Sequence, residues 1–292
     1  MIQNIKVKLS EKIKSELTDI VYRPYDSYRI DWYSNTQNFG DILNPTLITA
    51  LTGKTPIQVT SKTYKKTHHF VIGSILSRAT KHTTVWGTGF ISATSKCQEN
   101  PAKICAVRGP LTREILLQQN ISCPEVYGDP ALLLPLLFSP EIKKKYKLGI
   151  IPHYVDKNHQ VLSKIRTNPD IKVLDIQDPN PYNFICHLLS CEKIISSSLH
   201  GIIVADAYGI PSLWTEFSDK VTGEGFKFFD YFASVGREDT GPIKIEKLLN
   251  LESIFNQFYS YNINIDLDLL LKSSPFDISL QLPYSERTKA IN

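Results

Sequence analysis

Short apolar runs alternate with amphipathic segments along the chain, and several of the runs end at or near a glycine. This alternation favours buried parallel strands joined by crossover helices. In the first half of the chain it predicts strands at residues 28–33, 70–73, 85–87 and 104–107 and helices at residues 42–51 and 110–118. Pro110 suits the first turn of the second helix, because a residue there has no intrahelical partner for its N–H group.

The same alternation begins again at residue 148. It predicts strands at residues 148–151, 173–176, 193–195 and 210–214 and helices at residues 161–166, 182–189, 199–208 and 245–258. This order of elements indicates an α/β protein with two Rossmann-like lobes, parallel sheets and a central cleft. In such sheets, ligands bind beyond the carboxyl ends of the strands.

A basic, apolar-poor stretch at residues 143–147 marks the predicted boundary between the lobes. We therefore expect an N-terminal lobe at residues 1–142, a C-terminal lobe at residues 143–240, and helices at residues 241–292 that pack back on the lobes. The basic stretch suits a solvated linker. Its alternative is peripheral contact with an anionic membrane or glycolipid surface.

Composition favours a soluble globular protein. Hydrophobic residues make up 42% of the 292 residues, which is enough for a full core. The longest apolar runs, at residues 131–137 and 201–205, fall well short of the ~20 residues that a membrane span needs. The N-terminus lacks the apolar region of a signal peptide, so we expect a cytoplasmic protein that could contact the inner membrane peripherally.

Metal, disulfide and nucleic-acid chemistry are poorly supported. Five cysteines without a Cys-x-x-Cys pair argue for reduced thiols. The net charge of +4 suits an anionic substrate but is too small for a nucleic-acid partner. His68 and His69 would point to opposite faces of a strand, so we expect no metal site. Gly87-Thr88-Gly89 lacks the full dinucleotide fingerprint, so we expect no nicotinamide cofactor.

The clearest candidate chemistry lies at residues 194–205, which read as a strand, a turn of three serines and a helix. Serines can cap a helix whose free backbone N–H groups form an anion site. His200 falls in the first turn, where a histidine can donate a proton or hydrogen-bond a developing oxyanion. Gly201 is expected to let a ligand approach closely. The alternative is that the serines are only caps and His200 is an exposed helix residue.

This segment resembles the signature of the polysaccharide pyruvyltransferase family. Further pieces that resemble family elements occur in the family's order: Asn38-Phe39-Gly40-Asp41, Trp86-Gly87-Thr88-Gly89, Val107-Arg108-Gly109-Pro110-Leu111-Thr112, Tyr127-Gly128-Asp129-Pro130-Ala131 and Gly223-Glu224-Gly225-Phe226-Lys227-Phe228-Phe229-Asp230-Tyr231. The last block resembles one from a bacterial exopolysaccharide branch of the family. The resemblance covers residues 30–236, and the shared order makes it specific.

The resemblance implies a GT-B-like fold with phosphoenolpyruvate as the donor substrate and no cofactor. The implied acceptor is a hydroxyl pair on a sugar of a surface polysaccharide, such as an exopolysaccharide or capsule, or of its lipid-linked precursor. The implied product is a pyruvate ketal. One position departs from the family: several relatives have an arginine that helps to hold the donor where this chain has Ser198, so the donor's cation must come from elsewhere.

Ketal formation from phosphoenolpyruvate needs an acid, a base and groups that hold a carboxylate and a phosphate. His200 is the acid–base candidate, because an unperturbed histidine titrates near ~6.5. Asp41 is expected to act as a base or to bind acceptor hydroxyls, with N-capping as its alternative. Arg108 is expected to hold an anion at the reacting centre, since the planar fork of arginine suits carboxylates and phosphates.

The remaining expected site residues fall into two groups. The donor-binding group is Ser197, Ser198, Leu199, Gly201, Lys227, Arg113 and His153, and the acceptor-binding group is Asn38, Gly40 and Asp41. Solvated surface positions are the alternative for Arg113 and Lys227. Asp129 is expected to shape a turn rather than to act in the site.

Two other functions stay open. A GT-B glycosyltransferase that uses a nucleotide sugar would share the fold. Glu216 and Glu224 have the eight-residue spacing seen in many retaining members, but they follow the Gly209-Ile210-Pro211 turn instead of preceding it. A non-catalytic glycan-assembly protein would account for Ser198, and it predicts that His200→Ala leaves function intact.

Overall fold

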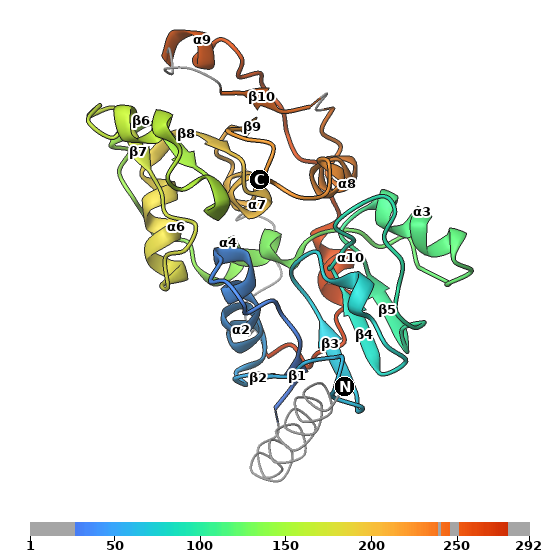
Figure 1. Ribbon diagram of the computed structural model, residues 1–292. Coiled ribbons are helices and arrows are strands. Elements are labelled where there is room, and N and C mark those ends of the chain that lie inside the picture. The colour runs from blue at the N-terminus through green and yellow to red at the C-terminus, as the bar shows by residue number, and fades with distance from the viewer. Residues whose placement is uncertain (1–26, 239–240, 246–250, 280–292) are drawn as a thin grey trace, which may run out of the picture.

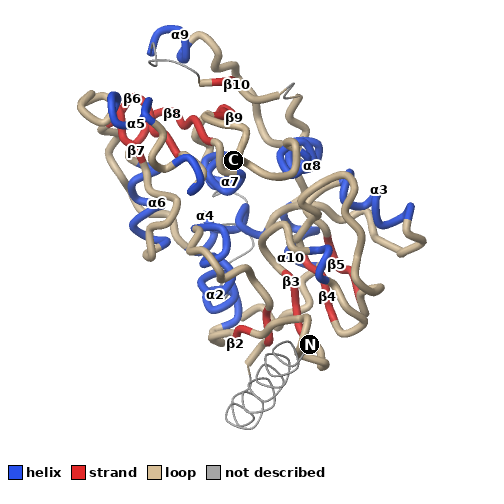
Figure 2. Tube along the Cα trace, in the orientation of Figure 1, coloured by secondary structure: helices blue, strands red, loops and turns tan. Residues whose placement is uncertain are grey.

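The computed structural model describes residues 27–238, 241–245 and 251–279. Within these residues the chain forms two parallel five-stranded sheets, with strand orders β2-β1-β3-β4-β5 and β10-β9-β8-β6-β7. Figure 1 shows the second sheet in the upper part of the view and the first sheet below it, with α7, α8 and α10 between them. The strands are short, and long loops join many of the elements (Figure 2). The predicted α/β class with parallel sheets is confirmed.

The first sheet comes from the N-terminal half of the chain. Its strands are β1 (Arg29–Ile30), β2 (Ile57–Gln58), β3 (His68–Phe70), β4 (Thr83–Trp86) and β5 (Lys103–Ala106). Its helices are α2 (Phe39–Thr52), the 3-10 helix η1 (Leu76–Arg78) and α3 (Pro110–Gln118). Every residue of β4, which lies between β3 and β5, is buried, as a parallel sheet covered on both faces requires.

Two predictions in this half differ in accuracy. The helix predicted at residues 110–118 is confirmed with the same bounds, and Pro110 is its first residue. The strand predicted at residues 28–33 is confined to Arg29–Ile30. The next side chain, Asp31, is buried and accepts a hydrogen bond from the Ser61 N–H group at 2.8 Å. The Asp31 N–H group still donates to the His69 carbonyl at 3.0 Å, and the chain leaves the sheet after this bond.

The second sheet comes from the later part of the chain. Its strands are β6 (Tyr146–Ile151), β7 (Ile171–Val173), β8 (Cys191–Ser196), β9 (Ser212–Glu216) and β10 (Ile243–Lys244). The helices that accompany it are η3 (Tyr154–Asp156), α5 (Gln160–Ile165), α6 (Pro181–Leu189), α7 (Leu199–Ala207) and α8 (Phe226–Ser234). The strand predicted at residues 173–176 overlaps the observed β7 only at Val173, because pairing with β6 aligns Ile171 with Leu148.

Helix α7 lies at the centre of the molecule. All of its residues from Leu199 to Asp206 are buried. It packs against β8 and β9 of its own sheet and against the 3-10 helix η2 (Pro130–Leu133), which continues into α4 (Leu134–Leu137). The helix that carries His200 is therefore held between the sheet of one lobe and the segment that leads out of the other.

After β10, helix α9 (Leu251–Phe255) packs on the core of the second sheet. The chain then returns to the first sheet, where it forms α10 (Leu267–Lys272). The indole N–H group of Trp86 donates to the Leu270 carbonyl at 2.9 Å, and the Ser279 N–H group donates to the Leu51 carbonyl at 2.9 Å. The helix predicted at residues 245–258 was too long. Residues 246–250 lie outside the described residues, and the helix beyond them ends at Phe255.

Side-chain and backbone contacts join the two lobes at several points. Helix α2 packs against α6, where the rings of Phe39 and Phe184 lie 4.1 Å apart. Helix α3 packs against α8. Over the part of the chain that the structure describes, no helix has the length and apolar character needed to span a bilayer.

Candidate active site

The ring of His200 lies against the backbone of the opposite lobe. His200 is the second residue of α7 and is 8% exposed. A Cβ atom built on Gly40, in the first turn of α2, would lie only 2.0 Å from its Nδ1 atom. Gly40 is therefore required for steric reasons, since any side chain at this position would displace the imidazole. The alternative of an exposed histidine on a helix surface does not fit this burial.

Asp129 contacts His200 from the other side. Its Oδ2 atom lies 3.5 Å from His200 Nε2, and neither atom has a hydrogen-bond partner among the described residues. Its Oδ1 atom accepts a hydrogen bond from the Ala131 N–H group at 2.9 Å and so caps η2. The expected role of Asp129 in shaping the turn is present, but the sequence reading missed its second oxygen. The Gly-Asp-Pro element was the signal that could have pointed to it.

Asp41 and Asn38 lie at the start of α2, beside Gly40. Asp41 is 7% exposed, and burial raises the pKa of its carboxyl to about 6, although the nearby His200 ring opposes the shift. Asn38 is the N-cap residue of α2 but makes no capping bond with its side chain. Its Oδ1 atom is buried without a partner among the described residues. A carboxyl that titrates near neutrality and an amide with an unused acceptor suit proton transfer and hydroxyl binding.

The serine turn before α7 is held by its own hydrogen bonds. The Oγ atom of Ser196 accepts from the Ser198 N–H group at 3.0 Å, and the Oγ atom of Ser197 accepts from the His153 N–H group at 2.8 Å. Ser198 is the N-cap residue but makes no capping bond with its side chain. The first N–H groups of α7, on Leu199 and His200, have no intrahelical acceptor and can receive an anion. The Leu199 side chain is 4% exposed and belongs to the core, so only its backbone can do so.

Gly201 has a different role from the expected one. A Cβ atom at this position would lie 2.3 Å from Ser196 Oγ and 3.0 Å from Ile151 Cγ2. The glycine therefore allows α7 to pack closely on the ends of β6 and β8. The expectation that Gly201 makes room for a ligand is corrected, because its missing side chain faces the sheet.

Lys227 and His153 bring two unusual ionisable groups to the same region. Lys227 lies in the first turn of α8; burial, and next the charge of Arg108, lower its pKa to about 8, while Asp41 opposes the shift. Burial, and next the charge of Lys227, lower the pKa of His153 to about 4. Among the described residues Lys227 forms no ion pair; its Nζ atom lies 5.7 Å from the centre of the Phe228 ring. A partly buried cation without a counter-ion favours an anionic ligand.

Arg108 is occupied by protein groups. It is completely buried, and its Nε and Nη2 atoms both lie 2.9 Å from Oδ2 of Asp230, on α8. Its Nη1 atom donates to Ser74 Oγ at 2.7 Å, and its Nη2 atom donates to the Phe90 carbonyl at 2.6 Å. Asp230 also accepts from the Thr112 N–H group at 2.8 Å. Arg108 therefore joins the lobes, and it acts on Lys227 through its charge.

Arg113 lies apart from this cluster. Its Nε atom donates to the Cys123 carbonyl at 3.0 Å, and its guanidinium pairs with Glu125 at 3.1 Å. These contacts hold the N-terminal half of α3 against the loop that follows the helix. The structure thus brings together His200, Asp129, Asp41 and Lys227 but does not bring Arg113 to them.

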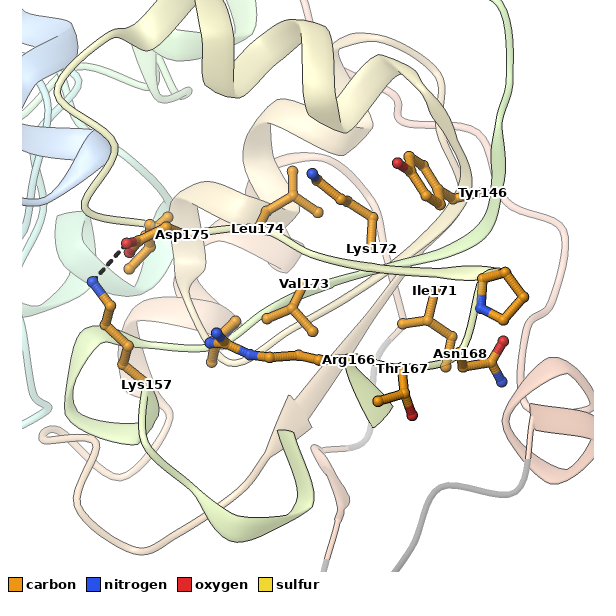
Figure 3. A pocket seen from close by; sticks show the side chains of 13 residues that line it. Tyr146, Lys157, Arg166, Thr167, Asn168, Ile171, Lys172, Val173, Leu174 and Asp175 are labelled. Carbon is orange, nitrogen blue, oxygen red and sulfur yellow. Dashed lines mark hydrogen bonds and ion pairs between the residues drawn. The ribbon is translucent and has the colours of Figure 1, made fainter. Parts of the chain in front are cut away.

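A separate cavity, of about 420 Å³, runs along the edge strand β7 (Figure 3). Its basic lining residues are Lys157, Arg166 and Lys172, and Lys157 is already paired with Asp175 at 2.6 Å. None of the residues around His200 lines it. Within the described ranges, no three His, Cys, Asp or Glu side chains are grouped so that they could hold a metal ion.

Comparison with known proteins agrees with the resemblance seen in the sequence. The sequence profile described as "Polysaccharide pyruvyl transferase" matches residues 16–218. An uncharacterized protein of Acanthamoeba polyphaga mimivirus is 32% identical over 255 residues, which cover 82% of this chain and 86% of that protein. The succinoglycan biosynthesis protein ExoV of Rhizobium meliloti is 29% identical over 216 residues, which cover 70% of this chain and 64% of the relative. No solved structure matches the chain.

Proposed function

This chain belongs to the polysaccharide pyruvyl transferase family, and we propose that it transfers pyruvate from phosphoenolpyruvate to a sugar of a surface polysaccharide or its lipid-linked precursor, forming a pyruvate ketal. The observation that carries the proposal is the grouping of an unpaired cation, Lys227, with an acid–base pair, His200 and Asp129, and with a carboxyl that titrates near neutrality, Asp41. The name of the Rhizobium relative, a protein of succinoglycan biosynthesis, supports a polysaccharide acceptor.

His200 is the proposed acid. Phosphoenolpyruvate must gain a proton at its methylene carbon, which leaves an electrophilic carbon that bears both the carboxylate and the phosphate. Asp129 Oδ2, at 3.5 Å from Nε2, would hold the ring and stabilise its protonated form. A general acid in this position typically contributes about 10²- to 10⁴-fold to the rate.

Asp41 is the proposed base. The first sugar hydroxyl loses its proton as its oxygen attacks the electrophilic carbon. The second hydroxyl then displaces phosphate from the same carbon and gives its proton to the departing phosphate, which completes the ketal and releases inorganic phosphate. A carboxyl with a pKa of about 6 is ionised at neutral pH and is more basic than an ordinary aspartate.

The donor's negative charges would be held by Lys227 and by the free N–H groups at the start of α7. These groups would replace the arginine that several relatives have at the position of Ser198. The small N-cap side chain leaves the helix terminus open, and the cation comes from α8 instead of from the turn. His153, neutral at pH 7 because its pKa is about 4, can donate or accept a hydrogen bond there without adding charge. Arg108 is proposed to position Lys227 and α8.

The finer assignments complete the proposal. We take the two lobes to be arranged as in GT-B enzymes, with the reaction at their junction and with phosphoenolpyruvate as a substrate in a reaction that needs no cofactor. We place the protein in the cytoplasm, where phosphoenolpyruvate is made. The lysines at residues 143–145 would contact the inner membrane surface when the acceptor is lipid-linked.

A direct comparison of donors tests the function. The full chain is incubated with oligosaccharides from succinoglycan that has been stripped of its acid-labile groups, together with phosphoenolpyruvate or with a panel of nucleotide sugars. We expect inorganic phosphate from phosphoenolpyruvate and a ketal methyl signal in the product's NMR spectrum. His200→Ala should lose both. Release of nucleoside diphosphate without phosphate from phosphoenolpyruvate would indicate a glycosyltransferase, and full function in His200→Ala would indicate a non-catalytic assembly protein.

A further inference from the structure

A cavity of about 330 Å³ opens directly in front of α2, next to the proposed reacting groups. Its walls come from the loop between β1 and α2, from the first turn of α2 and from Pro179 of the other lobe. Trp32 and Tyr33 form an aromatic side, and Asn38 and Asp41 form a polar side. The carboxyl that we propose as the base therefore belongs to the wall of this cavity.

The loop that forms the cavity is fixed to the second lobe. The side-chain amide of Gln37 donates to the Gln177 carbonyl at 2.9 Å, and that of Gln177 donates to the Gln37 carbonyl at 3.2 Å. The Phe39 N–H group donates to the Ile176 carbonyl at 2.8 Å. These three bonds hold the cavity at the junction of the lobes, so its shape does not depend on one lobe alone.

The two sides of the cavity match the two kinds of surface on a pyranose ring. A pyranose presents an apolar face of C–H groups and a rim of hydroxyls. Aromatic rings cover such apolar faces, and carboxylate and amide groups pair with hydroxyls. The buried Oδ1 atom of Asn38, which has no partner among the described residues, is an acceptor available to a hydroxyl.

The charge of the cavity selects among sugars. Among the described residues, Asp41 is the one charged residue that lines it. The Arg78 guanidinium lies 5.6 Å from the centre of the Tyr33 ring and pairs with Asp31 at 3.8 Å. An anionic group, such as a phosphate or a uronic acid carboxylate, would meet the Asp41 carboxylate, while the charge of Arg78 is shared with Asp31. The cavity along β7 differs, because lysines and an arginine line it (Figure 3). The cavity in front of α2 therefore suits a neutral sugar.

Its size suits one ring. Ligand pockets generally measure about 300–1,000 Å³, and this cavity lies at the lower end of that range. We propose that it is the acceptor subsite and that it takes a single neutral pyranose, with Trp32 as the stacking surface and Asn38 and Asp41 on the hydroxyl rim. This inference rests on the proposed function, since it names the substrate class of the same site.

Tryptophan fluorescence can test the subsite without turnover. Of the three tryptophans, Trp86 is fully buried and Trp214 is 3% exposed, whereas Trp32 is only partly buried. Quenching by acrylamide therefore reports mainly on Trp32. We expect methyl glucoside and methyl galactoside to protect it and glucuronic acid to fail at pH 8, where Asp41 is ionised. Trp32→Phe, which removes the reporter, should abolish the accessible quenching.

Turnover provides the second measurement. Trp32→Ala should raise the acceptor KM about tenfold while leaving kcat and the binding of phosphoenolpyruvate unchanged, as expected for the loss of one aromatic contact. Tyr182→Ala is the matched control, because Tyr182 is an exposed aromatic residue of α6 outside the cavity. It should leave both the protection and the KM unchanged.

The outcomes separate the two proposals. Absence of protection by either neutral glycoside up to its solubility limit, or equal protection by glucuronic acid, would overturn the neutral-pyranose subsite. Protection by the neutral glycosides but not by glucuronic acid, in a protein whose melting temperature does not respond to phosphoenolpyruvate, would support the subsite and reject the donor.

Discussion

The imidazole of His200 occupies the space that a side chain on Gly40 would need, with Nδ1 only 2.0 Å from the position of such a Cβ atom. The two residues belong to different lobes and to the first turns of two different helices, α7 and α2. Close contact between these helix termini places the proposed acid beside the proposed base, Asp41. The close approach of the lobes at this point thus depends on a residue without a side chain at position 40.

Gly40→Ala tests this contact. Gly40 has helical geometry, so alanine suits the backbone, and the expected effect is displacement of the His200 ring. A misplacement of about 1 Å can reduce turnover about 100-fold, and we expect a loss of that size in kcat. The matched experiment introduces Gly40→Ala into a His200→Ala background, where it should have little further effect. Equal losses in both backgrounds would show that Gly40 acts independently of the histidine.

Asp129→Asn distinguishes the roles of the two carboxylate oxygens of Asp129. An asparagine can still accept the bond from the Ala131 N–H group, but in place of Oδ2 it presents an amide donor to His200 Nε2. We expect kcat to fall at least about tenfold and its pH dependence to change, while the denaturant midpoint stays near that of the wild type. A parallel loss of stability and activity, with an unchanged pH profile, would reduce Asp129 to a capping residue.

The pH dependence of kcat/KM for phosphoenolpyruvate should be bell-shaped. Activity should rise as Asp41 ionises near pH 6 and fall as Lys227 loses its proton near pH 8. Lys227→Arg should move the alkaline limb upward, because arginine stays charged at this pH. An alkaline limb that stays near pH 8 in Lys227→Arg would assign it to another group.

Stability should respond to Asp41 in the opposite direction from an ordinary salt-bridged aspartate. Its pKa is raised from 3.8 to about 6 in the folded state, so the folded protein holds the proton more tightly than the unfolded chain does. Stability should therefore fall as pH rises from 4 to 6. Asp41→Asn should remove this dependence and stabilise the protein above pH 6 by on the order of 3 kcal/mol. Urea unfolding at pH 4 and pH 7 measures the free energy of unfolding of both proteins. The same change between the two pH values in the wild type and in Asp41→Asn would contradict the prediction.

The ion pairs of Arg108 and Arg113 should contribute very different amounts to the free energy of unfolding. Asp230→Asn leaves the buried Arg108 guanidinium without its carboxylate, and such changes typically reduce the free energy of unfolding by about 3–5 kcal/mol. Arg113→Ala removes a partly exposed pair with Glu125, which is worth at most about 1 kcal/mol. Guanidinium unfolding of the two variants measures the contrast. Similar losses in both would mean that the buried pair does not join the lobes as described.

The pattern of apolar and polar positions was sufficient for most of the secondary structure. Strand and helix periodicity are local properties, which is why the helix at residues 110–118 and the strands around β4, β6 and β8 could be read directly. The errors lie where a tertiary contact overrides the local pattern. The chain leaves the first sheet after Asp31, whose carboxylate binds the Ser61 N–H group, and the partner strand β6 sets the position of β7.

The candidate site divides in the same way. His200, Asp41 and Lys227 could be chosen from the residue type and the motif around each, because acid–base and anion-binding chemistry depends on the side chain itself. The contacts around these residues could not be predicted from the sequence. The second oxygen of Asp129, the occupation of Arg108 by Asp230, and the packing role of Gly201 all depend on contacts between segments far apart in the chain. Local sequence sets which groups are available, and the docking of the two lobes determines which of them meet a ligand and which meet one another, because burial and charge pairing are settled only when the lobes are in contact.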